Sequence, residues 1–383
     1  MLRRTILRAE VVYNGLGTPR AGGAVVVQDD GTRRRVVAVD GVEGARRAYP
    51  DAQEQDVGFA VSPPPVNAHT HLDLSAMPFS EGSYQDFILA VVRHQRTGAR
   101  GVEAARAGLA EVLASGVRVL GDIVTDEAVM HFLLELPDVS GVAYWEVIGP
   151  DPEDADRIFE ETRRRLAAFR ERERPGGLRV GISPHTPHTV SPPLLRRLAV
   201  LARAEGYPMQ IHVAETADEV RLHREGKGPL VELLAHFGVR WQPSGSSPVG
   251  YLASLGVLEA RPTLVHMVHV DEEDVRAVQR ADCAVVHCPR SNEALGCGRF
   301  PWELYARFGV DVAFGTDSRG SSPSLAVTDE VRFSRALHGA KANPQALVRA
   351  AVKGGYRALD LTPPRVQRGA PADAMFVWPV STA

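Results

Sequence analysis

The chain has 383 residues, of which 44% are apolar and 24% are charged, and its net charge is −3. This length and composition are typical of a globular protein with a sizeable core, in one large domain or two ordinary ones. The small net charge gives no overall attraction to nucleic acid or to an anionic membrane, so we expect neither as a partner.

The cysteines indicate a reducing compartment. Cys283, Cys288 and Cys297 are odd in number and form no C-x-x-C pair, so a disulfide framework is not expected and the cytoplasm is the expected location. The N-terminal MLRRTILRAEVVYNG begins with basic residues but has no continuous apolar segment of the kind found in a signal peptide. Apolar runs such as FILAVV are too short to span a bilayer.

The expected elements change character along the chain. Residues 1–60 contain short alternating runs, such as AVVVQ and RRVVAV, that predict antiparallel strands joined by glycine turns. Residues 61–360 alternate short β-branched runs with amphipathic helical patterns such as PEDADRIFEETRRRLAAFRER and SPPLLRRLAVLARAE. The eight expected strands are PVNAHTH, VRVLGDIV, GVAYWEVI, LRVGIS, PMQIHV, PTLVH, CAVVHC and VDVAFGTD. This alternation predicts parallel strands with helical crossovers, and eight such units predict an α/β fold of the (β/α)8 TIM barrel type.

The C-terminal segment GAPADAMFVWPV returns to an extended pattern and is expected to rejoin the N-terminal strands. We therefore predict a composite β-sandwich domain from residues 1–60 and 361–383, and a TIM-barrel domain from residues 61–360.

Polar side chains end five of the eight expected strands, where a barrel of this type carries its reactive groups. His69 and His71 lie two residues apart in VNAHTH, so on an extended strand both imidazoles point to the same face. The corresponding residues of the other strands are His185, His212, Glu215, His266 and Asp317. A set of His, Glu and Asp side chains gathered at one end of a barrel predicts a metal-dependent active site.

The residue types suggest a division of roles. Three imidazoles and one carboxylate can hold a single divalent ion, zinc or iron, and leave one position open for water, whose pKa the ion lowers until hydroxide is available. Asp317 can also accept the proton of that water, and His266 can hydrogen-bond the attacking oxygen. Glu215 lies three residues beyond His212 and is a candidate proton shuttle. The candidate ligands are His69, His71, His212 and Asp317.

The motifs H-T-H, S-P-H, H-x-A-E and G-T-D-S, in this order and with a histidine at strand six, resemble those of the amidohydrolase superfamily. The resemblance covers nearly the whole chain and is greatest to the mononuclear purine and pyrimidine deaminases. GISPHTPHTVSPPLL and HCPRSNEALGCG are similar to segments of adenosine-type deaminases. NAHTHLDLS, EGSYQDFILAVVRHQR and LVHMVHV are similar to a subgroup that includes 6-aminodeoxyfutalosine deaminases of menaquinone biosynthesis.

This resemblance implies a reaction. It implies that His185 contacts a nucleoside, and that Glu215 protonates the purine ring nitrogen and then passes a proton to the departing ammonia. Hydroxide would attack C6 of an adenine, and the adduct would collapse with loss of ammonia. Many two-metal relatives bridge their ions with a carboxylated lysine, but no lysine lies between His71 and His212, which favours a single ion. Relatives also lead us to expect a homodimer.

The chain departs from the family pattern at several positions. His188 stands where the usual residue is tyrosine, and we expect this to change the shape of the pocket. Arg93, Arg96 and Arg319 lie in segments near the expected pocket, and guanidinium groups suit a carboxylate, which aminodeoxyfutalosine carries on its benzoate. We therefore predict that these three arginines bind the substrate.

The remaining histidines have structural interpretations. His287, within VVHCP, is expected to be buried behind the site. Five others fall on helical patterns and are expected to be exposed to solvent, namely His94, His131, His223, His236 and His338.

The preferred function is deamination of 6-aminodeoxyfutalosine to futalosine. Adenosine, S-adenosylhomocysteine and methylthioadenosine are the close alternatives, followed by guanine or another heterocycle. Hydrolysis of a cyclic amide on the same scaffold is a second class of function. An inactive scaffold is a third, and the complete set of ligands argues against it.

Overall fold

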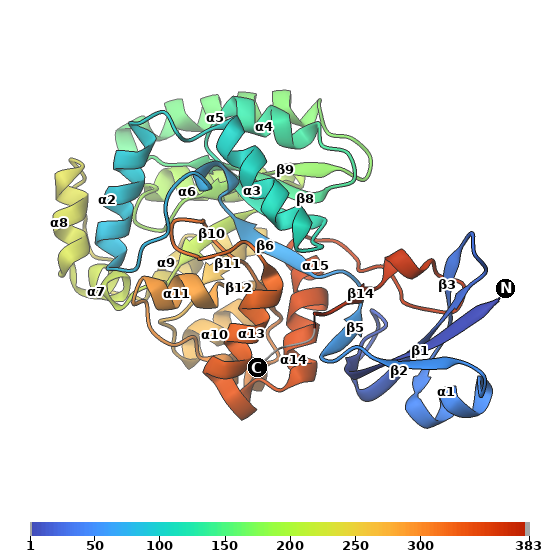
Figure 1. The fold of residues 1–383 in the computed structure, drawn as a ribbon. Helices are drawn as coiled ribbons and strands as arrows, with labels where there is room; N and C mark the ends of the chain where they lie inside the picture. The colour runs from blue at the N-terminus through green and yellow to red at the C-terminus, as the bar shows by residue number, and fades with distance from the viewer. Residues whose placement is uncertain (1, 380–383) are drawn as a thin grey trace.

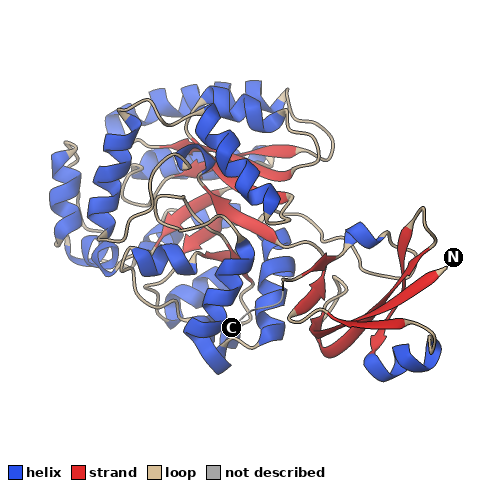
Figure 2. Cartoon of the chain, viewed as in Figure 1, coloured by secondary structure: helices blue, strands red, loops and turns tan. Residues whose placement is uncertain are grey.

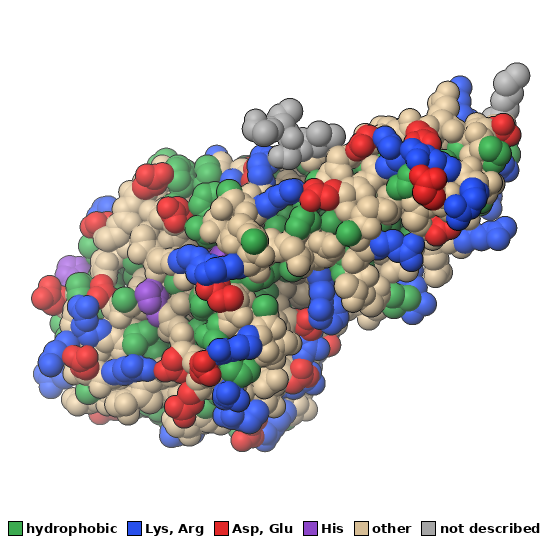
Figure 3. All heavy atoms as spheres, turned by 90° about the horizontal axis from the view of Figure 1, so that it is seen from below, with side chains coloured by type: hydrophobic (Ala, Val, Ile, Leu, Met, Phe, Trp, Pro, Cys, Tyr) green, Lys and Arg blue, Asp and Glu red, His purple; other side chains and the backbone are tan. Residues whose placement is uncertain are grey.

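The structure, a computed structural model, describes residues 2–379. Residues 380–383, which include the end of the expected C-terminal segment, lie outside the described residues, as does residue 1. Within the described residues, no helix combines the length and the apolar character needed to cross a membrane. Acidic and basic side chains are interspersed over the face of the molecule drawn in Figure 3, which shows no extended region of one charge.

Eight parallel strands form a closed barrel, which confirms the predicted fold class (Figure 1). The strands lie in two four-stranded sheets, joined by bridges between Ile182 and Met209 and between Thr70 and Asp317. All eight coincide with the predicted segments: β6 (Val66–Thr70), β7 (Val119–Val124), β8 (Ser140–Val147), β9 (Leu178–Pro184), β10 (Gln210–Val213), β11 (Thr263–His266), β12 (Val285–His287) and β13 (Val312–Phe314). Their residues are almost all buried because helices cover the outside and side chains fill the inside.

Helices surround this barrel on its outer face (Figure 2). Most bury an apolar stripe toward the barrel, as α6 does with its leucines, whereas α2, α7 and α8 pack against one another in a separate apolar cluster. Several begin with a side-chain cap, such as Asp126 of α4 and Asp271 of α10, whose carboxylates accept two main-chain N–H groups of the first turn. The helices are α2 (Tyr84–Gln95), α3 (Val102–Ala114), α4 (Glu127–Leu134), α5 (Ala155–Arg170), α6 (Pro192–Glu205), α7 (Ala217–Glu225), α8 (Pro229–His236), α9 (Pro248–Ser254), α10 (Glu272–Arg280), α11 (Pro289–Ala294), α12 (Trp302–Phe308), α13 (Val327–His338), α14 (Pro344–Arg349) and α15 (Gly355–Ala358).

A smaller β-sheet projects from one side of the barrel (Figure 1). Its strands are β1 (Arg3–Val12), β2 (Arg20–Asp29), β3 (Arg34–Gly41), β4 (Gln53–Asp56), β5 (Ala60–Ser62) and β14 (Phe376–Val377). β1, β2 and β3 are antiparallel, as predicted, whereas β4 and β5 run parallel to β1. The described strands form one sheet, and α1 (Val42–Ala48) packs on one of its faces.

The two ends of the chain meet in this sheet. β14 pairs with β5 in antiparallel register, and Trp378 donates a hydrogen bond from Nε1 to the Oγ of Ser62 at 2.8 Å. β5 is followed by three prolines that lead directly into β6. The sheet is thereby attached next to the first strand of the barrel, which carries the histidine pair. The predicted domain boundaries at residues 60 and 361 stay a prediction.

Candidate active site

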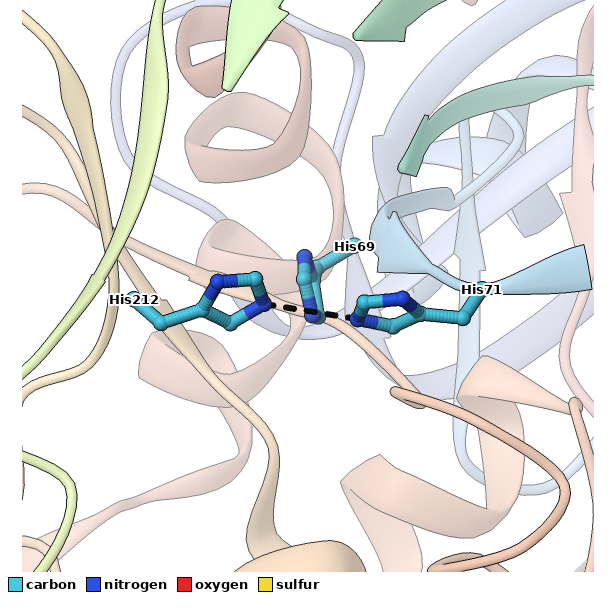
Figure 4. Close-up of side chains that lie close together, drawn as sticks. All are labelled: His69, His71 and His212. Atoms are coloured by element: carbon cyan, nitrogen blue, oxygen red, sulfur yellow. Dashed lines mark hydrogen bonds between the residues drawn. The ribbon is translucent and has the colours of Figure 1, made fainter. Parts of the chain in front are cut away.

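Three imidazoles meet at the carboxyl end of the barrel. His69 lies at the end of β6, His71 follows it, and His212 lies on β10, across the barrel from them. The Nε2 atoms of His71 and His212 are 3.3 Å apart, and Figure 4 shows the three rings turned toward one another. Two nitrogen ligands of a tetrahedral zinc ion, each about 2.0–2.1 Å from the metal, are themselves roughly 3.3 Å apart. The spacing of these nitrogens therefore fits a bound divalent ion.

Hydrogen bonds fix which nitrogen of His69 and of His212 faces the centre. Nδ1 of His69 lies 2.6 Å from Oε1 of Gln210, whose amide nitrogen donates to the carbonyl oxygen of Ala68. The oxygen of Gln210 is thus an acceptor, so His69 carries its proton on Nδ1 and leaves Nε2 free. Nδ1 of His212 likewise donates to the main-chain oxygen of His185 at 2.9 Å. Such outer contacts hold a ring in the tautomer that a metal ligand requires.

Asp317 supplies the carboxylate of this group. Its Oδ1 lies 3.4 Å from Nε2 of His71 and 3.6 Å from Nε2 of His69. Its Oδ2 accepts hydrogen bonds from the hydroxyls of Ser291 and Ser321, at 2.6 and 3.1 Å. Burial alone would raise the pKa of Asp317, but the surrounding imidazoles hold that pKa well below its usual range. The site therefore offers three imidazole nitrogens and one carboxylate oxygen, a donor set suited to zinc or iron.

Close packing brings the first and last strands of the barrel together here. A Cβ atom on Gly315 would lie 2.7 Å from the Cβ of His69, so only glycine leaves room for that imidazole. Main-chain N–H groups of Thr316 and Asp317 both donate to the carbonyl oxygen of His69 at 3.1 Å. The contact places the carboxylate of Asp317 directly beside the histidine pair.

Glu215 and His266 lie together on the other side of the centre. Oε2 of Glu215 is 3.7 Å from Nε2 of His266, and its Oε1 accepts a hydrogen bond from the thiol of Cys297 at 3.6 Å. Burial raises the pKa of Glu215 well above its usual value, and the charges of Asp317 and Glu219 raise it further. Burial lowers the pKa of His266 to about 4. These shifts favour the protonated form of Glu215 and the neutral form of His266, as proton transfer to a substrate requires.

The strand ends at this centre share an uncommon backbone conformation. Ala214, His266, Met267 and Asp317 all have φ between 50° and 70°. Residues other than glycine adopt this left-handed region at a cost, and such residues concentrate at functional sites. The tight turns point His266 and Asp317 into the barrel mouth instead of along the strand.

A cavity opens beside the imidazoles. One wall is apolar and comes largely from α2, through Tyr84, Phe87, Ile88 and Val91. The other lining residues are Leu74, Arg100, Glu146, His185, Glu215, His266, Asp317 and Ser318, together with His71 and His212. His185 thus lies where a substrate contact was predicted. The cavity combines an apolar wall with a few convergent polar groups, as in most small-molecule sites.

The structure does not bring the three predicted arginines into this cavity. Tyr84, Phe87, Ile88 and Val91 recur at helical spacing along one side of α2, and Arg93 falls on the opposite side, where it is exposed. Arg96 follows the end of α2 and is also exposed, and Arg319 turns away to pair with Glu111 at 3.2 Å. The geometry gives no support to their assignment as substrate-binding residues.

Sequence reasoning missed two charged residues that do line the cavity. Arg100, in the loop after α2, is largely buried and donates from Nε to the carboxylate of Asp73 at 2.6 Å. Glu146 lies near the carboxyl end of β8. The sequence does contain a signal for Glu146, because it is the one charged residue in an otherwise apolar strand. Arg100 gave no signal, because only the folding of its loop brings it to the cavity.

Two of the helical histidines are buried, so the prediction of solvent exposure is wrong for them. His223 is 0% exposed and His338 is 4% exposed. His223 lies on the inner side of α7, near His188 of the loop after β9. His287 is fully buried, as expected, and its Nε2 lies 3.2 Å from Nε2 of His338.

Comparison with known proteins agrees with this architecture. The family model described as "Amidohydrolase family" matches residues 60–379. The chain belongs to the amidohydrolase family. It is therefore a hydrolase, as the strand-end motifs predicted.

Curated relatives match this chain over most of its length. The aminodeoxyfutalosine deaminase of Deinococcus radiodurans is 45% identical over 98% of this chain and 90% of its own length. The 5-methylthioadenosine/S-adenosylhomocysteine deaminase of Natronomonas pharaonis is 30% identical, over 93% of this chain and 83% of its own length.

Solved structures support the same fold. The aminofutalosine deaminase of Helicobacter pylori, in complex with methylthio-coformycin, has a TM-score of 0.74 at 19% identity and covers 96% of this chain and 90% of its own. An adenosine deaminase from Xanthomonas campestris with bound zinc has a TM-score of 0.66 at 23% identity, covering 97% of this chain and 83% of its own.

Proposed function

We propose that this amidohydrolase hydrolytically deaminates 6-aminodeoxyfutalosine, giving futalosine and ammonia in menaquinone biosynthesis. The observation that carries the proposal is the 45% identity to an aminodeoxyfutalosine deaminase over nearly the whole chain. The buried acid Glu215 beside His266 is consistent with it, because removal of ammonia from an adenine requires a proton donor at the ring nitrogen.

The proposed metal site consists of His69, His71, His212 and Asp317. A divalent ion held there would lower the pKa of a water molecule toward neutrality and so supply hydroxide. We propose zinc, and the zinc-bound adenosine deaminase with this fold supports that choice over iron.

The chain's own residues would carry the protons. Asp317, held ionised, accepts the proton of the attacking water. His266 donates from Nδ1 to Oδ1 of Asn292 at 2.9 Å, which leaves its Nε2 to hydrogen-bond the attacking oxygen. Glu215 gives its proton to N1 of the purine, then takes up the hydroxyl proton of the adduct and passes it to the amino group, so that ammonia leaves as the C6 carbonyl forms. The proton held by Asp317 then restores Glu215. Water and the amine are consumed, and the C6 carbonyl and ammonia are formed.

The cavity offers groups suited to the rest of this substrate. Glu146 and His185 can hydrogen-bond ribose hydroxyls, and Oε1 of Glu146 has no partner among the described residues. The apolar side of α2 can pack against an aromatic ring. Nε of Arg100 donates a hydrogen bond to Asp73. Its two terminal nitrogens make no hydrogen bond to the described residues, so they can bind the carboxylate of the substrate.

A comparison of substrates tests the proposal. Ammonia release would be measured for 6-aminodeoxyfutalosine, adenosine, S-adenosylhomocysteine, methylthioadenosine, guanine and cytosine, with metal-analysed protein. We expect 6-aminodeoxyfutalosine to lead by orders of magnitude in kcat/KM, and a chelator to abolish the activity. A lead for another adenine nucleoside would reject the substrate but retain the reaction. No turnover of any of the six with metal bound would reject purine deamination.

Methylthioadenosine and S-adenosylhomocysteine remain the second candidates, because a deaminase of these compounds is 30% identical over most of the chain. We also propose that the enzyme is a cytoplasmic homodimer. Gel filtration with light scattering would give the molecular mass in solution, and the mass of a monomer would refute the dimer.

A further inference from the structure

A second cluster of metal-ligating side chains lies beside the active site. It consists of His188, Glu219 and His223, and each offers a ligand atom within 4.8 Å of the other two. His188 is 5% exposed, Glu219 3% and His223 0%. None of the three belongs to the candidate catalytic set.

The polar atoms of this cluster lack partners. Nδ1 of His188, Oε1 of Glu219 and both ring nitrogens of His223 make no hydrogen bond to any of the residues that the structure describes. Nδ1 of His188 and Oε1 of Glu219 are 3.9 Å apart, which is too far for a hydrogen bond. The rings of Trp241 and Tyr251 pack around His223, with centroids 4.8 and 5.1 Å away. Buried polar atoms are normally paired, so four such atoms in one place indicate a missing ligand.

The protonation of the cluster suits a cation. Burial lowers the pKa of His223 to about 3 and that of His188 well below its usual value, so both imidazoles are neutral and keep a lone pair. The same burial raises the pKa of Glu219 to about 7. Among the described residues, no arginine or lysine forms an ion pair with Glu219. A divalent cation would supply the compensating charge.

We propose that His188, Glu219 and His223 bind a second divalent transition-metal ion, of the zinc class, separate from the catalytic one. Two of the ligands lie four residues apart on α7 and so face the same side of that helix, and the third comes from the loop after β9. Two imidazole nitrogens and one carboxylate oxygen form a donor set typical of zinc. The His188–Glu219 separation is slightly wider than the 3.3 Å between two catalytic nitrogens, and small side-chain rotations close it.

This ion would act on the catalytic acid through the main chain. Oε2 of Glu219 accepts the main-chain N–H of Glu215 at 2.8 Å, while Oε1 points into the cluster. An ion bound to Oε1 fixes the Glu219 carboxylate and, through it, the backbone of Glu215. Glu219, His188 and His223 are therefore positioning residues.

Metal counting tests this site without any substrate. Protein stripped with a chelator, reloaded with zinc and desalted would be analysed by inductively coupled plasma mass spectrometry. We expect about two ions per chain in the unaltered protein, and one in His223→Gln, in Glu219→Gln and in His71→Gln. The double variant His71→Gln/His223→Gln should bind none. The control His236→Gln, which alters an exposed histidine of α8, should keep two.

A single ion in the unaltered protein would overturn the inference. It would also be overturned if His223→Gln and Glu219→Gln each still bound two ions. Loss of both ions in His71→Gln alone would instead indicate a two-metal catalytic centre and would also reject the second site. If the α7 variants do not fold, anomalous scattering at the zinc edge from crystals of the unaltered protein decides the matter. A peak at His69, His71 and His212 without one at His188, Glu219 and His223 would refute the site. The count is independent of the substrate comparison, so failure of the proposed function would leave it unchanged.

Discussion

Replacing Glu215 by glutamine should separate proton transfer from every other task of the active site. The amide has nearly the same size as the carboxyl group and can keep its contacts with Cys297 and His266, which lie 3.6 and 3.7 Å away. It cannot give up a proton to the purine. General acid–base groups contribute roughly 10²–10⁴-fold to rates, so kcat/KM should fall by that factor, or about 3–5 kcal/mol of transition-state stabilisation.

The pH dependence provides a second measure of the same residue. Burial raises the pKa of Glu215 well above its usual value, so the group stays protonated when an exposed glutamate would be ionised. An acid that must be protonated loses activity as the pH rises through its pKa. The kcat/KM of the unaltered enzyme should therefore decrease on the alkaline side. The residual kcat/KM of Glu215→Gln should not show the decrease that deprotonation of Glu215 causes.

The assay is steady-state ammonia release, with metal content and circular dichroism recorded for each variant. Glu225→Gln makes the same chemical change at an exposed position at the end of α7 and should match the unaltered enzyme. Retention of more than a tenth of kcat/KM by a folded, metal-loaded Glu215→Gln protein would refute the assignment of Glu215 as the acid. A loss of bound metal would show instead that Glu215 helps to hold the ion.

Three further predictions follow from the cavity and the core. Arg100→Ala should raise KM for 6-aminodeoxyfutalosine roughly 10–100-fold, as expected for loss of a charge-assisted hydrogen bond, and should affect KM for adenosine much less. Arg93→Ala, which alters an exposed residue, should change neither KM. Equal effects of Arg100→Ala on both substrates would exclude carboxylate binding by Arg100. Gly141→Ala should destabilise the fold by about 3 kcal/mol or more in a denaturant titration, because φ of Gly141 is 132° and the new Cβ would lie 1.9 Å from the carbonyl oxygen of Leu120. As a control, the Cβ of Gly82→Ala would have no atom within 4 Å, so that variant should have nearly unchanged stability. Trp378→Ala should cost about 3–5 kcal/mol, since this buried indole packs on Phe59 and Phe376; a change below 1 kcal/mol would mean that the C-terminal segment does not hold the small sheet to the barrel.

The barrel and its polar strand ends could be predicted from local patterns. Short β-branched runs alternate with amphipathic helices, and that alternation leaves few topologies besides a closed parallel barrel. His69, His71, His212, His266 and Asp317 stand out because each interrupts or ends an apolar run. Once the strands are parallel, residues at their carboxyl ends must gather at one mouth. The structure brings these five side chains together as that geometry requires.

The sequence alone did not determine which charged residues face the cavity. Arg93 and Arg100 are equally basic and lie close together in the chain, yet one is exposed and the other lines the pocket. The outcome depends on the rotation of α2, which its packing against neighbouring elements sets, and on the loop that carries Arg100 back to Asp73. Neither has a local signature.

The same holds for His188 and His223. The pattern of α7 is polar enough to predict an exposed His223, but Trp241 and Tyr251, from later parts of the chain, cover that side of the helix. Local sequence thus determined the elements and the candidate ligands at their ends, because periodicity and chain direction fix both. Tertiary packing decided the burial of the remaining polar groups, because burial depends on neighbours that are distant in the chain.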